Sequence, residues 1–239
     1  MEVSVDRRVR RYARRCGAST GGTTVGVKNG ADSPWAQPGA APARRRPTWR
    51  TAAATIGIFV VALYLIELVD SATGGGLEPG GITPRTVDGL SGVAFAPVLH
   101  GTWSHLFANT LPVLVLGFLV LASGIGKGLA VTGIVWVVGG LGTWLVGGAG
   151  TTHIGASILV FGWLAYLLVR GLFTRDAGQI LIGIVVFLVY GGLLWGVLPT
   201  NPLVSWQGHL FGAVGGVLAA WLLDSRRRRS AAVDRTAVR

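Results

Sequence analysis

One serine and two histidines lie in apolar stretches of this sequence, each close to the point where its stretch begins. They are Ser157, His209 and His105, and Asn109 follows His105 four residues later. A serine hydroxyl becomes a nucleophile when a neighbouring base takes its proton, and a neutral imidazole is the usual base. Ionisable groups inside apolar segments point to a functional site. These residues therefore predict nucleophilic catalysis, with Ser157 as nucleophile and His209 as base.

The pair His105 and Asn109 would share one face of a helix, and both side chains donate hydrogen bonds. With the backbone N–H of Ser157 they would hold the oxyanion of a tetrahedral intermediate. Because the acidic residues all lie in tails, loops or span ends, we expect a Ser/His dyad without a third carboxylate. The alternative for each polar residue alone is a hydrogen bond that joins two membrane helices.

Small residues surround the predicted base and nucleophile. Three glycines at a spacing of four form a stripe beside His209: Gly208, Gly212 and Gly216. Such a stripe lets another helix approach closely, and we expect that helix to carry Gly155 and Ser157. Phe161, four residues after Ser157, projects from the same side and is expected to pack against the imidazole.

Six apolar segments of membrane-spanning length must position these residues. A helix needs about 20 apolar residues to cross a bilayer. The predicted spans are 52–69, 103–122, 129–147, 155–173, 179–198 and 207–223. Of the 239 residues 51% are hydrophobic, only 10 are acidic and 38 are glycine, which excludes an ordinary soluble domain. We predict an all-α membrane protein, a six-transmembrane-helix bundle.

The basic residues predict how the bundle is oriented. Lys127, Arg170 and Arg175 lie in or beside the second and fourth connections, whereas the third and fifth connections contain no Lys or Arg. Cytoplasmic loops of membrane proteins carry an excess of Lys and Arg, so we expect both termini in the cytoplasm. The membrane is expected to be a bacterial inner or plasma membrane. The first connection, 70–102, is expected to be a structured loop in the outer interface with a short interfacial helix.

In this orientation the second, fourth and sixth spans begin on the outer side of the membrane. His105, Ser157 and His209 each lie about one helical turn from such a start. They would therefore share one shallow depth below the outer interface, where water can reach them.

Basic segments flank the predicted membrane domain, 51–224. Residues 1–50 are rich in Arg, Gly, Ala and Pro and are expected to form a disordered basic cytoplasmic tail, and 225–239 a second basic cytoplasmic tail. The net charge of +11 arises mainly there. Anionic lipid is the expected partner of these tails, and nucleic-acid binding is the lesser alternative. The oligomeric state is left open.

Three stretches resemble motifs of the rhomboid intramembrane serine proteases, in the family's order, within about residues 80–223. They are His100-Gly-Thr-Trp-Ser-His105-Leu-Phe-Ala-Asn109, Gly155-Ala156-Ser157, and Gly208-His209-Leu-Phe-Gly212-Ala-Val-Gly-Gly216. The resemblance implies a serine endopeptidase that cleaves transmembrane or membrane-proximal segments of other membrane proteins. It implies Ser157 as nucleophile and His209 as base, with no cofactor. It also implies substrate access past the fifth span and the loop after it.

One position departs from the family pattern, which has a glycine after the serine where this sequence has Ile158. A stiff β-branched side chain there would push the fourth span from the sixth, or would turn toward lipid or the substrate path. Ile158 motivates a second hypothesis, a catalytically inactive rhomboid-like protein that binds transmembrane helices.

A third hypothesis is a metal site or proton pathway built from histidines, because all four histidines are expected near the outer side: His100, His105, His153 and His209. Against a metal, a spacing of five would splay His100 and His105 around a helix, and no thiolate is available. We therefore predict no metal.

Overall fold

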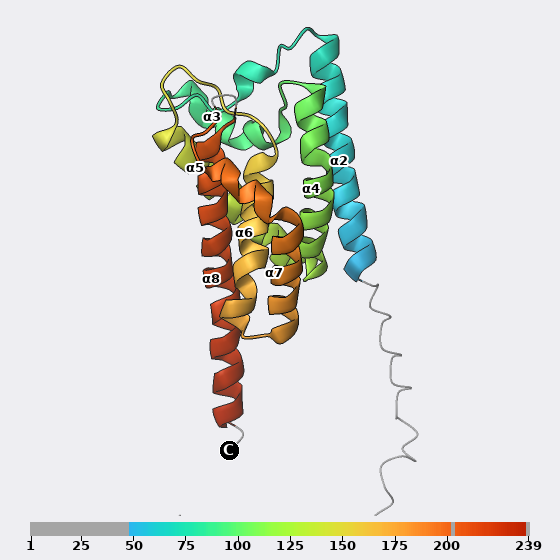
Figure 1. The fold of residues 1–239 in the computed structure, drawn as a ribbon, viewed down its shortest axis with the longest axis vertical. Helices are drawn as coiled ribbons and strands as arrows, with labels where there is room; N and C mark the ends of the chain where they lie inside the picture. The colour runs from blue at the N-terminus through green and yellow to red at the C-terminus, as the bar shows by residue number, and fades with distance from the viewer. Residues whose placement is uncertain (1–47, 202–203, 238–239) are drawn as a thin grey trace, which may run out of the picture. The chain divides into compact units, whose positions relative to one another are not determined.

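The computed structural model describes residues 48–201 and 204–237, with the backbone alone for Thr48 and 226–237. Long helices form the bundle (Figure 1): α2 (Thr48–Ala72), α4 (Trp103–Ala122), α5 (Ile125–Val146), α6 (Ser157–Thr174), α7 (Ala177–Tyr190) and α8 (Trp206–Ala237). Together with η4 (Gly191–Val197), which extends α7, they supply six segments long and apolar enough to cross a membrane. The predicted all-α, six-span fold is confirmed.

Helix α6 lies at the centre of the bundle and contacts α4, α5, α7 and α8. In its most apolar stretch 72% of the residues are buried, against 11% for α7. Large side chains such as Trp163, Leu164 and Tyr166 point in different directions from α6, and all are enclosed. A helix that is apolar all round is buried by its neighbours. The candidate nucleophile Ser157, the first residue of α6, therefore stands at the start of the central helix.

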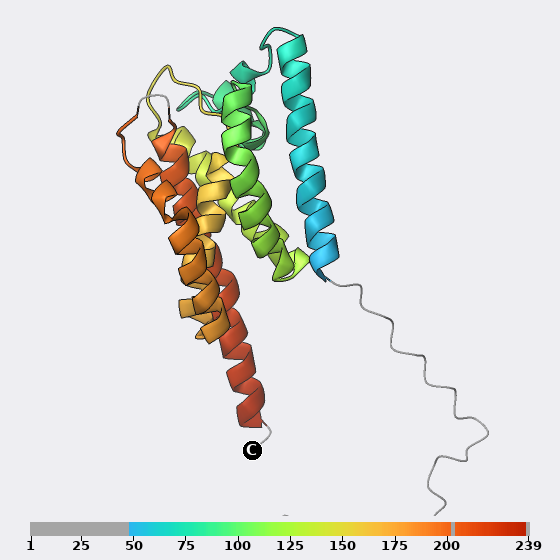
Figure 2. The same cartoon turned by 45° about the vertical axis from the view of Figure 1, so that its right-hand side comes forward.

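Helices α6 and α8 run side by side in both views of the bundle (Figures 1 and 2), and their backbones come close together. A Cβ added at Gly212 would fall on the carbonyl oxygen of Ile158, and one added at Gly216 on that of Gly162. The predicted glycine stripe of α8 thus faces α6 one turn at a time. Gly155 is not part of this contact, because α6 begins only at Ser157.

The first connection is folded and fastened to α5. It contains η2 (Glu78–Gly80), α3 (Asp88–Phe95) and η3 (Ala96–Val98), so the expected short helix is present. The indole nitrogens of Trp136 and Trp144 donate to backbone carbonyls of this connection at 2.8 Å. Ile82 and His153 exchange two backbone hydrogen bonds of 3.0 Å. The connection is therefore a fixed platform beside the start of α6.

The opposite end of the bundle holds an ion pair between the partly buried Lys127 of α5 and the fully buried Asp224 of α8. The guanidinium of Arg170 lies 5.3 Å from the ring centre of Tyr166. We expected Lys127 in the connection before α5, whereas it lies inside that helix; Arg170 lies near the end of α6, beside the fourth connection as expected. Helix α5 begins earlier than the predicted span because the buried carboxylate of Asp224 receives the charge of Lys127, and the charge of Arg170 lies beside the ring of Tyr166.

The flanking segments differ in how much of them is described. Of the predicted disordered tail, 1–50, residues 1–47 lie outside the described residues. Residues 48–50 belong to α2. At the other end the backbone of α8 continues through the predicted tail to Ala237.

Candidate active site

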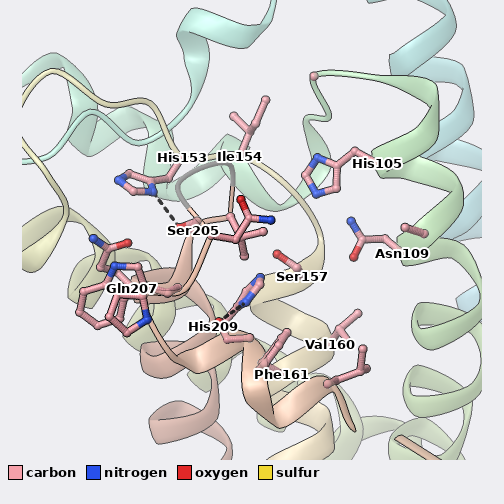
Figure 3. A pocket seen from close by; sticks show the side chains of 18 of the residues that line it. His105, Asn109, His153, Ile154, Ser157, Val160, Phe161, Ser205, Gln207 and His209 are labelled. Atoms are coloured by element: carbon pink, nitrogen blue, oxygen red, sulfur yellow. Dashed lines mark hydrogen bonds between the residues drawn. The ribbon is translucent and has the colours of Figure 1, made fainter.

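A cavity of ≈ 960 Å³ opens at the end of the bundle where α4, α6 and α8 begin. It collects the predicted site residues His105 and Asn109 from α4, Ser157 and Phe161 from α6, and His209 from α8. Their side chains point toward one another across the cavity (Figure 3). Segments about 50 residues apart in the sequence thus contribute to one site.

The backbone before Ser157 is held in a shape that requires glycine. Gly155 has φ +120°, and a Cβ there would lie 2.7 Å from the imidazole of His105. Its N–H donates to the carbonyl of Ala96 at 2.8 Å. We expected Gly155 to lie on a helix against α8. It lies instead in the turn before α6 and faces α4, because its left-handed conformation is incompatible with a helix.

The first turn of α6 presents unpaired backbone donors beside Ser157. No side chain among the described residues caps this helix, and its first hydrogen-bonded N–H groups are those of Leu159 and Val160. The first N–H groups of a helix have no partner within the helix and carry a partial positive charge. The N–H groups of Ser157 and Ile158 are therefore available to a developing negative charge.

His209 is held by two contacts. Its Nδ1 lies 2.9 Å from the carbonyl oxygen of Gly196 in η4, and a carbonyl can only accept a hydrogen bond. Its ring stacks on Phe161 with centroids 3.9 Å apart and an interplanar angle of 8°. The hydrogen on Nδ1 leaves Nε2 with a lone pair, the form that a general base needs. Within the described residues no hydrogen bond yet joins Ser157 to His209.

Asn109 is an unpaired donor at the cavity wall. The residue is 6% exposed, and its Nδ2 has no hydrogen-bond partner among the described residues. Buried amide nitrogens are normally paired, so an orphan at a cavity needs an explanation. His105 stands one turn before it, where the hydroxyl of Thr102 caps α4 by accepting from the His105 N–H at 3.2 Å.

Comparisons with known proteins agree on one family. The Rhomboid domain model matches residues 87–226. An uncharacterized protein of Mycobacterium tuberculosis is 52% identical, over 82% of this chain and 85% of its own length. One of Mycobacterium leprae is 46% identical over 79% and 78%. "Putative rhomboid protease YdcA" of Bacillus subtilis is 26% identical over 55% and 66%.

The chain belongs to the rhomboid family. Its described residues include six helical segments long and apolar enough to cross a membrane, so it is a multi-pass membrane protein. No solved structure matches the chain.

Ile158 is the residue by which this rhomboid departs from the family's motif. Its side chain is 2% exposed and does not line the cavity. It points between α5 and α8, where Gly139 and Gly208 leave room for it. A Cβ added at Gly139 would collide with the Ile158 side chain, and one added at Gly208 would lie 3.0 Å from it. The Ile158 side chain therefore points neither to lipid nor to the substrate path. Gly139 on α5 leaves space for this side chain, which stands where the family motif has a glycine.

The four histidines do not converge on one point. The rings of His100 and His105 meet edge to face at 5.1 Å, whereas His153 and His209 bind other groups. The expected splaying of His100 and His105 is wrong, because His100 precedes α4 and its chain is not helical there. No group of three or more His, Cys, Asp or Glu in the described parts of the chain has an arrangement that would hold a metal ion.

Two of these histidines have structural partners. The Nε2 of His100 accepts from the Ala156 N–H at 3.4 Å, and burial, with His105 nearby, lowers the pKa of His100 to about 4. It is thus neutral at pH 7 and able to accept. His153 Nδ1 lies 2.7 Å from the hydroxyl of Ser205, and burial also lowers the pKa of His153.

Sequence reasoning missed Ser205 and Gly196. The Ser205 hydroxyl accepts from the Gly208 N–H at 3.3 Å and bonds His153, so it caps α8 and ties it to the connection before α6. A serine just before an apolar run is a recognisable capping signal. Gly196 acts through its carbonyl, a group that every residue has, so no residue pattern could have revealed it.

Proposed function

We propose that this rhomboid is an intramembrane serine endopeptidase, which cleaves transmembrane or membrane-proximal segments of other membrane proteins with a Ser157/His209 dyad. The observation that carries the proposal is the shared cavity: a serine, an oriented imidazole and an unpaired buried amide line it together. No carboxylate belongs to that lining in the described residues, which agrees with a dyad.

In the proposed reaction Nε2 of His209 takes the Ser157 hydroxyl proton, and Oγ attacks the scissile carbonyl. The carbonyl oxygen becomes an oxyanion, which the Ser157 N–H, His105 and the Asn109 amide stabilise. His209 then gives its proton to the leaving amine. Water hydrolyses the resulting ester of Ser157 by the same steps and regenerates the enzyme. No cofactor takes part.

The surroundings of the cavity suit a substrate that arrives through the membrane. Its wall includes Pro112 of α4, Leu193 of η4 and Pro199 just after η4. Helix α7 is the least buried helix of the bundle, and it contacts mainly α6 and η4. We propose that the substrate segment enters past α7 and the loop after η4, while the folded first connection lies in the outer interface. Both termini would then lie in the cytoplasm.

Labelling with a fluorophosphonate, which reacts with activated serines, tests the proposal. Detergent-solubilised wild type is expected to be labelled, and Ser157→Ala is expected to lose the label. Ile158→Gly is expected to be less stable than wild type and to gain no labelling, because it empties packed space between α5 and α8. A wild type that stays unlabelled while Ile158→Gly is labelled would favour the inactive, helix-binding alternative.

Replacing Asn109 should separate catalysis from stability. We expect Asn109→Leu to lower the rate of substrate cleavage by about 10²- to 10³-fold, the usual effect of removing one oxyanion donor. The melting temperature should not fall, because the Asn109 amide nitrogen has no partner to lose. Cleavage of a fluorescent transmembrane substrate and thermal unfolding in detergent measure the two effects.

The neighbouring Thr110 provides the reverse control. Its hydroxyl lies 3.0 Å from that of Tyr64 and joins α4 to α2, away from the cavity. Thr110→Val should reduce stability by roughly 0.6 kcal/mol and leave cleavage unchanged. Equal loss of cleavage in Asn109→Leu and Thr110→Val would remove Asn109 from the oxyanion site.

A further inference from the structure

The group that orients the candidate base is a backbone carbonyl in the short 3-10 helix η4. We propose that Gly196 is a positioning residue for His209: its carbonyl keeps the ring hydrogen on Nδ1, and its missing side chain lets that carbonyl reach the stacked ring. The inference rests on the proposed function, because it adds a residue to the same site.

The contacts around His209 assign the Gly196 carbonyl the role of orienting the imidazole. The Nδ1 of His209 is 2.9 Å from the Gly196 oxygen, and the parallel ring of Phe161 covers one face of the imidazole. His209 is 8% exposed. In a serine protease with a triad, a buried carboxylate holds the histidine in the correct tautomer. Here the cavity lining of the described residues contains no carboxylate, and the carbonyl occupies the corresponding position.

The chemistry of the cycle depends on this bond twice. Before proton transfer, the Nδ1–H donated to Gly196 makes Nε2 the only ring nitrogen that can accept the Ser157 proton. After transfer, the ring is a cation, and the Nδ1–H bond to the carbonyl becomes charge-assisted and shorter. The same acceptor therefore selects the reactive tautomer and supports the protonated intermediate.

The requirement for glycine at position 196 is steric. A Cβ there would lie 2.8 Å from Cζ of Phe161 and 3.0 Å from Nδ1 of His209. Contacts this short force the stacked rings away from η4, so the hydrogen bond must lengthen or break. Gly192, four residues earlier in η4, lines the same cavity but has nothing within 4 Å of the corresponding position. The two glycines thus form a matched pair for substitution.

Nitrogen-15 NMR of histidine-labelled protein tests the tautomer directly, with the His209 signal assigned by its loss in His209→Gln. In the wild type we expect His209 with its hydrogen on Nδ1. Gly196→Ala should populate the form with the hydrogen on Nε2, and Gly192→Ala should resemble the wild type. A wild-type His209 with its hydrogen on Nε2 would overturn the inference without any variant.

Kinetics give the second readout. We expect Gly196→Ala to reduce kcat by about 10- to 10²-fold with KM within about twofold of wild type, because the substrate still binds while the base is misplaced. Gly192→Ala should keep both constants. Equal kcat in Gly196→Ala and wild type would refute the role of Gly196 and leave the protease proposal intact. A wild type that cleaves nothing would refute the protease proposal instead, whichever tautomer NMR shows.

Discussion

Ser157→Ala and His209→Ala are each expected to reduce cleavage by about 10⁴-fold or more, and the double variant to be no slower than either. A nucleophile and its base act as a unit, so losing one removes most of the benefit of the other. The rates of cleavage of one membrane substrate by all three variants measure this coupling. The variants should keep the melting temperature of the wild type within a few degrees, since Ser157 and His209 face the cavity.

A second serine–histidine pair in the same cavity supplies the sharpest control. Ser205 and His153 lie 2.7 Å apart and would be chosen as the dyad on distance alone. Ser205, however, is the cap of α8, and His153 is fixed by Thr151 on its other nitrogen at 2.8 Å. Ser205→Ala should therefore lose about 1 kcal/mol of stability and keep its fluorophosphonate label. Loss of the label in Ser205→Ala but not in Ser157→Ala would move the active site to the second pair.

Gly212→Leu is expected to lower the stability of the bundle by about 3 kcal/mol or more, or roughly 6–12 °C in melting temperature. A side chain at position 212 would collide with the carbonyl oxygen of Ile158, which belongs to the backbone of α6 and cannot rotate away. Helix α8 must then separate from α6, and His209 moves away from Ser157. Thermal unfolding in detergent measures the first effect, and probe labelling measures the second.

Gly133→Leu in α5 is the control for this prediction. The position of a Cβ at Gly133 has nothing within 4 Å, so the same substitution adds the same bulk without a collision. It should leave both the melting temperature and the labelling near wild type. Equal melting temperatures for Gly212→Leu and Gly133→Leu would contradict close packing of α8 on α6.

The sequence predicts the spans, and it also predicts the residues that the fold brings to one cavity. An apolar run of about 20 residues has few alternatives in a chain of this kind, because lipid forces every backbone polar group into a helix. Hence α4 has the bounds predicted for it, 103–122. Ser157, His209 and Asn109 stood out for a similar reason, since polar side chains in such runs need a partner or a function.

Other features depend on partners that are distant in the sequence. The sequence around Ile158 does not predict that Gly139 of α5 leaves space for its side chain. The sequence around Lys127 likewise does not predict its ion pair with Asp224. Helix packing brings such positions together only after each helix has formed, and local patterns describe a helix but not which neighbour it faces. The orientation of the His209 ring is even harder to predict from the sequence. It depends on the carbonyl of Gly196, and an acceptor that every residue possesses is distinguished only by where the folded chain places it.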